Sequence, residues 1–114
     1  MEAIMAKSDS VELNCPMEIG LNLLSGKWRL RIVWLLLKGP IRFNELQRKL
    51  QPITTKTLTR ELRDLEYHGL IRRTVFPEVP PKVEYSITAL GNSVQPILKE
   101  LCIWGEAYRT TAHK

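Results

Sequence analysis

The stretch from residue 44 to residue 87 constrains the fold most, because it predicts two short helices, a tight turn between them and then two strands. Asn44 and Gln47 have the spacing of a capping box, so we expect a helix to begin at Asn44. Pro52 cannot continue that helix and indicates a turn. Thr54 offers a second N-cap, and leucines recur behind it at helical spacing until a glycine ends the run.

Two runs rich in β-branched and aromatic residues follow, Ile71–Phe76 and Lys82–Ile87. This composition is typical of strands, and the proline-rich segment between them favours a stiff, extended loop. Residues 41–43 are too short for an independent strand, and we expect them to add a rung to the edge of this hairpin. The whole pattern predicts a winged helix: a mainly helical fold with a small β-wing.

The second predicted helix has an apolar side and a basic side. Its apolar stripe consists of Leu58, Leu62 and Leu65, and its outward face carries Lys56, Thr59, Arg60 and Arg63. A basic, hydroxyl-bearing helix face suits the major groove of double-stranded DNA. The first two turns carry no acid, and recognition helices contact bases chiefly through those turns. The alternative is an ordinary solvated face on which Glu61, Asp64 and Glu66 form ion pairs along the helix.

Candidate DNA-binding residues therefore lie on this helix and on the wing. They are Thr54, Thr55, Lys56, Thr57, Thr59, Arg60, Arg63, Arg72, Arg73 and Lys82. One threonine serves as the helix cap, and neighbouring strand residues point to opposite faces, so Arg72 and Arg73 cannot enter the same groove. We expect one of these arginines, or Lys82 near the wing tip, to contact phosphate. The net charge of +5 agrees with a phosphate-rich partner but is weak evidence alone.

Two further helices flank this unit, at about residues 16–24 and 89–108. Apolar residues in the second recur every four and three positions, the pattern of a helix packed along its length, although Pro96 should kink or break it. That helix either covers its own domain or joins two subunits. We expect a homodimer, because closed twofold assemblies dominate among oligomers. The expected interface residues are Met17, Leu21, Leu24, Val94, Ile97, Leu101, Trp104 and Tyr108.

The length of 114 residues is typical of one domain. We expect a flexible arm over residues 1–14, the winged-helix domain over 15–108 with its helix–turn–helix at about 44–68 and its wing at about 71–87, and a tail over 109–114. No export signal or long apolar run is evident, so the chain is expected to be cytoplasmic, with no membrane partner. Catalytic, metal-binding and cofactor-binding patterns are lacking, which argues against an enzyme.

Several motifs, in order along the chain, resemble one family. They are Cys15-Pro16, Gly26-Lys27-Trp28, Arg42-Phe43-Asn44-Glu45-Leu46, Lys56-Thr57-Leu58-Thr59, Pro80-Pro81-Lys82-Val83-Glu84-Tyr85 and Trp104-Gly105. This series is similar to the HxlR family of bacterial winged-helix transcription regulators, relatives of the MarR group. The resemblance implies a homodimer built from the first and C-terminal helices, on an operator of near-twofold symmetry. Such an operator is an inverted repeat, with one recognition helix in each half-site.

The same resemblance implies that small reactive molecules regulate some members through a cysteine just before the first helix, where Cys15 stands. A thiol at a helix N-terminus has a raised thiolate fraction, whereas the alternative is an inert buried cysteine. Cys102 is expected to serve packing, and a Cys15–Cys102 disulfide across subunits stays open. No residue pattern indicates a particular small-molecule effector.

Two other functions need weighing. A winged helix that serves only as a protein-interaction module would present an apolar or acidic outward face, where this chain has Lys56, Arg60 and Arg63. Binding to structured RNA is disfavoured because the deep groove of A-form helices is too narrow for a helix.

Overall fold

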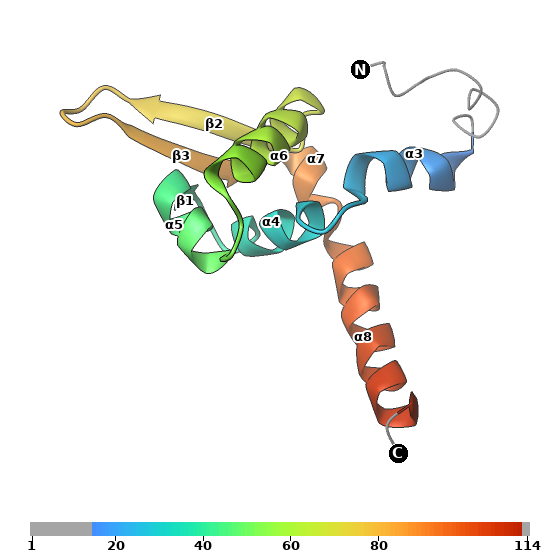
Figure 1. The fold of residues 1–114 in the computed structure, drawn as a ribbon. Coiled ribbons are helices and arrows are strands. Elements are labelled where there is room, and N and C mark those ends of the chain that lie inside the picture. Colours follow the sequence, from blue (N-terminus) through green and yellow to red (C-terminus); the bar gives the residue numbers. More distant parts are fainter. Residues whose placement is uncertain (1–14, 113–114) are drawn as a thin grey trace.

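The computed structural model describes residues 15–112, and Figure 1 shows a small sheet beside a group of short helices. The elements in order are α3 (Pro16–Leu24), α4 (Arg29–Leu36), β1 (Ile41–Arg42), α5 (Phe43–Lys49), α6 (Thr55–Tyr67), β2 (Ile71–Phe76), β3 (Lys82–Ile87), α7 (Ala89–Asn92) and α8 (Gln95–Ala112). The predicted winged helix is confirmed. The predicted arm over residues 1–14 lies outside the described residues, and α8 extends beyond the predicted end at residue 108.

The sheet is antiparallel, with the strand order β1-β3-β2. Both wing strands have the predicted bounds, and their register pairs Ile71 with Ile87 and Phe76 with Lys82. The short strand β1 pairs Ile41 with Tyr85, which confirms the rung expected at the edge of the hairpin. This pairing ties the start of α5 to the base of the wing.

The core lies where the helices meet the base of the sheet. It contains Ile32, Val33 and Leu36 of α4, Leu46 of α5, Leu58, Leu62 and Leu65 of α6, and Ile71 and Tyr85 of the sheet. The three leucines of α6 are almost completely inaccessible, so the predicted apolar stripe is confirmed. Its burial fixes which side of α6 faces solvent.

The two helices of the helix–turn–helix begin differently. Thr54 caps α6 as predicted, because its Oγ1 accepts a hydrogen bond from the Thr57 backbone N at 3.1 Å. The capping box predicted at Asn44 is wrong, since α5 begins at Phe43 with Arg42 as N-cap. Pairing with β3 keeps the backbone extended through Arg42, so the helix starts immediately afterwards. Gln47 instead bonds forward, to Thr55 Oγ1 at 3.0 Å.

The C-terminal helix is interrupted. The expected single helix over residues 89–108 is divided into α7 and α8, and Pro96 lies in the first turn of α8, where its missing N–H costs nothing. The predicted break near Pro96 is therefore confirmed. Val94 lies at the junction and is only 7% exposed, so it belongs to its own core and is not available to a partner subunit.

The two flanking helices leave the core in different directions (Figure 1). Helix α8 projects downward in that view, whereas α3 extends to the right, away from it. Helices α3 and α8 therefore do not lie side by side within one chain. Among residues 15–112, no helix combines the length and hydropathy of a membrane span.

Candidate nucleic-acid interface

Helix α6 presents a basic face to solvent. Lys56, Arg60 and Arg63 are exposed and recur at spacings of four and three, so they line the side opposite the buried leucines. We call these three residues the basic face. Tyr67 continues the same line and is 74% exposed. The sequence interpretation missed it, although its spacing of four from Arg63 was the available signal.

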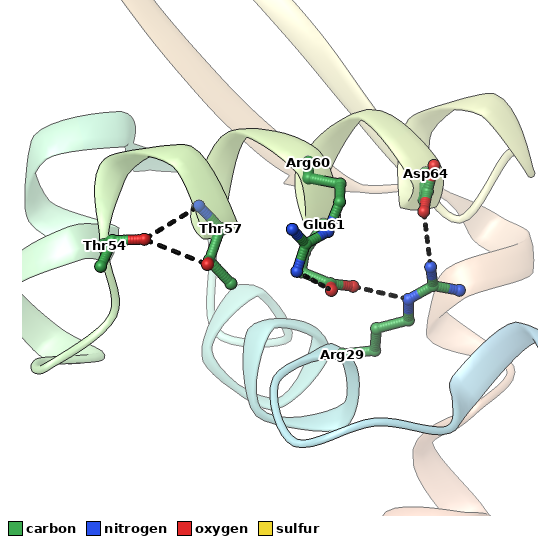
Figure 2. A network of polar contacts seen from close by, with 6 residues as sticks. All are labelled: Arg29, Thr54, Thr57, Arg60, Glu61 and Asp64. Atoms are coloured by element: carbon green, nitrogen blue, oxygen red, sulfur yellow. Dashed lines mark hydrogen bonds and ion pairs between the residues drawn. The ribbon is translucent and has the colours of Figure 1, made fainter.

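Two carboxylates of α6 are turned toward α4. Arg29, the first residue of α4, places Nε 2.7 Å from Glu61 Oε1 and Nη2 2.7 Å from Asp64 Oδ2, as Figure 2 shows. The predicted ion pairing along α6 is found only between Arg60 and Glu61, at 3.5 Å. Arg29 was missed by the sequence interpretation, since it lies in a different helix far away along the chain. Its contacts hold both carboxylates on the side of α6 that faces α4.

The threonines at the start of α6 have different roles. Thr54 is occupied as the cap, and its Oγ1 also lies 3.0 Å from that of Thr57. Thr55 is exposed and shares hydrogen bonds with Gln47 of α5, which joins the two helices of the motif. Thr59 is half-buried and faces the sheet, where it lines a cleft with Arg63 and other residues. Thr55 and Thr59 therefore lie where α6 meets its neighbours.

The wing brings one of its three candidate cations to α6. Arg73 lines the same cleft as Thr59 and Arg63. Arg72 is also exposed, but strand alternation directs it to the other face of the sheet. Lys82 is engaged within the wing: its Nζ lies 4.4 Å from the centre of the Phe76 ring and 3.9 Å from a carboxylate oxygen of Glu84. These two contacts hold the Lys82 side chain against the wing.

Two further surfaces, one on α3 and one on α8, are apolar. The exposed residues are Met17, Ile19 and Leu21 on α3 and Ile97, Leu101, Ile103, Trp104 and Tyr108 on α8. From Lys99 to Ala112 every residue of α8 is exposed. Trp34 of α4 is 45% exposed and lines a groove with Leu98 and Leu101 that continues the surface on α8. Leu24 is partly buried against its own core, so the expected interface is smaller on α3 than the sequence suggested.

Both cysteines are exposed. Cys15 is the N-cap of α3, as its place in the sequence predicted, and its thiol is not buried among the described residues. Cys102 lies on α8 beside the apolar groove. The packing role expected for Cys102 is not fulfilled within its own chain.

Comparison with known proteins identifies the group to which this fold belongs. A family model described as HxlR-like helix-turn-helix matches residues 23–113. The chain belongs to the HxlR family. It is a winged-helix transcriptional regulator of HxlR and MarR type, a class of DNA-binding proteins that are not enzymes.

Individual relatives agree with this assignment. The chain is 48% identical over 97 residues to an uncharacterised HTH-type transcriptional regulator of Methanothermobacter thermautotrophicus, which covers 85% of this chain and 74% of that protein. It is similar to the redox regulator HypR in its reduced form, with 40% identity, a TM-score of 0.81 and coverage of 86% and 97%. The reduced form of the transcriptional regulator YodB from Bacillus subtilis gives 34% identity, a TM-score of 0.75 and coverage of 88% and 97%.

Proposed function

We propose that this HxlR-family regulator is a homodimer that binds an inverted-repeat DNA operator through α6. The observation that carries this proposal is the exposed basic face opposite the buried leucines, on a helix whose Glu61 and Asp64 are held toward α4 by Arg29. Arginine and lysine side chains at this position can donate to phosphate oxygens and to the N7 and O6 acceptors of guanine in a major groove. The predicted binding residues are the basic face, the threonines around its start and Arg73.

Arg60 has the strongest claim to a base contact. It belongs to the first half of α6, and its guanidinium is paired only with Glu61 at 3.5 Å, with more than half of the side chain exposed. This contact is longer than the 2.7 Å contact between Glu61 and Arg29, which remains when Arg60 turns to a base edge. Lys56 and Arg63 flank it and are suited to phosphates, which fix the position of a protein on the duplex.

The apolar surfaces of α3 and α8 support the dimer. Helix α8 is exposed along most of its length and carries the large side chains of Leu101, Trp104 and Tyr108. A monomer rarely exposes so many large apolar side chains on one helix. Twofold pairing of two such helices would bury these side chains and place two α6 helices on one side of the assembly. Recognition helices in successive major grooves lie about 34–36 Å apart, which requires two half-sites related by inversion.

A role limited to binding another protein is the second candidate function. It would need an apolar or acidic outward face on α6, and the one large apolar side chain exposed there among the described residues is Tyr67. The charge of the basic face therefore favours DNA.

We further propose that Cys15 receives a chemical signal. Its thiol is exposed at the start of α3, beside Met17 and the apolar surface of α3 assigned to the dimer. Solved structures similar to this chain include HypR in oxidised as well as reduced form and YodB treated with diamide. Oxidation or alkylation of Cys15 would add bulk or charge beside the dimer contact and alter the spacing of the two α6 helices.

Selection from a pool of random duplexes tests the main proposal. The wild-type protein should enrich an inverted repeat, and inserting about half a helical turn between its half-sites should abolish tight binding, because the two helices could no longer reach both grooves. An insertion of one full turn is the matched control for the added length. Equal affinity for the original and the half-turn duplex would overturn the twofold arrangement.

A further inference from the structure

A single guanidinium joins three helices. Arg29 belongs to α4 and donates from Nη1 to the Leu23 carbonyl of α3 at 3.1 Å. The same side chain donates from Nε to Glu61 and from Nη2 to Asp64, both on α6 and both at 2.7 Å. Its side chain is only 15% exposed. The three nitrogens of Arg29 are thus divided between the end of α3 and the side of α6.

The geometry of these contacts restrains α6 more than one ion pair would. The guanidinium is planar and rigid, so two carboxylates bound by its different nitrogens cannot move independently. Glu61 and Asp64 are three positions apart on one side of α6, and holding both opposes rotation of the helix about its axis. The basic face lies on the same helix, so the direction in which it points depends on this contact.

The bond to α3 adds a second helix to the restraint. The carbonyl of Leu23 lies in the last turn of α3, where backbone acceptors lack partners within the helix. Arg29 supplies one of these partners. The end of α3 and the side of α6 are therefore held by the same side chain.

We propose that Arg29 is a positioning residue that sets the orientation of α6 relative to α3 and thereby the sequence specificity of DNA binding. This inference rests on the proposed function. Arg29 itself does not lie on the basic face, and its side chain is turned inward between the helices (Figure 2). Its effect on DNA is exerted through the direction in which α6 presents Arg60 and its neighbours.

A purely stabilising role predicts a different result. Loss of folded protein lowers the apparent affinity for every duplex by the same factor, whereas misorientation of α6 lowers affinity for the preferred sequence and spares contacts to phosphate. The informative quantity is therefore the ratio of Kd for a scrambled duplex to Kd for the duplex that the wild type selects. That ratio is independent of the fraction of protein that is folded.

The experiment compares Arg29→Met with Arg31→Met. Arg31 is an exposed residue of the same helix whose guanidinium lies over the Trp28 ring, so its replacement removes the same charge without touching α6. We expect the Kd ratio to fall about tenfold in Arg29→Met, the discrimination carried by one base contact, and to change less than twofold in Arg31→Met. An unchanged ratio in Arg29→Met, or an equal fall in Arg31→Met, would overturn the proposal.

Asp64→Asn provides a second variant that should fold in any case, because the Asp64 side chain is 48% exposed. It removes one of the two contacts between Arg29 and α6. The Kd ratio should therefore also fall, by a smaller factor than in Arg29→Met. If Arg29→Met does not fold, a wild-type ratio in Asp64→Asn refutes the positioning role. A wild-type protein without a preferred sequence would instead refute the proposed function, and this inference with it.

Hydrogen exchange tests the link to α3. Amide exchange in the last turn of α3 should quicken in Arg29→Met and stay at the wild-type rate in Asp64→Asn, since only the first variant loses the bond to Leu23. The same exchange rate in both variants would show that α3 is not held by Arg29.

Discussion

Replacing Gly91 by alanine should destabilise the protein strongly. Gly91 is buried in α7, and an added Cβ would overlap the carbonyl oxygen of Leu70 and lie 2.8 Å from Ile87 Cδ1. The Leu70 oxygen cannot withdraw freely, because it accepts hydrogen bonds from the backbone N of Thr88 at 3.2 Å and from Thr88 Oγ1 at 3.0 Å. Helix α7 must therefore move away from the base of the wing.

The size of the effect follows from these contacts. Two weakened hydrogen bonds cost about 1 kcal/mol each, and overpacking of a filled core costs about 1–3 kcal/mol. Alanine in a helix recovers about 1 kcal/mol relative to glycine. The free energy of unfolding should therefore fall by about 2–4 kcal/mol, which corresponds to a drop in Tm of roughly 10–30 °C for a domain of this size.

Thermal and urea denaturation followed by circular dichroism measure this loss. The protein concentration is held fixed, because the proposed dimerisation would make Tm concentration-dependent. Asn92→Ala is the matched control, since Asn92 is the next residue of α7 and is exposed, and its unfolding free energy should stay within about 0.5 kcal/mol of wild type. A loss below about 0.5 kcal/mol in Gly91→Ala would contradict the close approach of α7 to Leu70.

Three further predictions concern the proposed function. Arg60→Ala should weaken binding to the selected duplex by about 1–3 kcal/mol and alter sequence preference, whereas unchanged binding of every duplex would show that α6 does not read bases. Leu101→Asp should yield monomers in sedimentation velocity, since a buried charge opposes pairing, and Lys99→Asp on the other side of α8 should remain dimeric; a dimeric Leu101→Asp would remove α8 from the interface. Diamide should change the Kd for the selected duplex in the wild type and not in Cys15→Ser, and an identical response in both would exclude Cys15 as the sensor.

Features encoded by neighbouring residues were predictable from the sequence. The wing strands were placed correctly because their β-branched and aromatic composition is local, and Thr54 was recognised as a cap from its own position before an apolar repeat. The basic face followed from the burial of three leucines at helical spacing. In each case the signal lies within a few residues of the feature.

Features that depend on distant contacts were not predictable in this way. The start of α5 is set by the pairing of Arg42 with Glu84 on β3, which overrides the capping-box pattern at Asn44. Arg29 contacts Glu61, which lies 32 positions further along the chain, and Asp64, which lies 35 positions further. No local pattern of residues indicates these contacts. Val94 has the spacing of an interface residue, but the interruption between α7 and α8 turns it into the core.

The strand order β1-β3-β2 leaves the wing with an open edge, and such edges invite aggregation by pairing with another chain. Here the edge strand β2 carries Arg72 and Arg73 and ends before Pro77, and β3 follows Pro80 and Pro81. The positive charges on β2 oppose the addition of a foreign strand, and the prolines keep both strands short. Pairing between the wings of two copies is thereby opposed, and the proposed dimer is left to its helices.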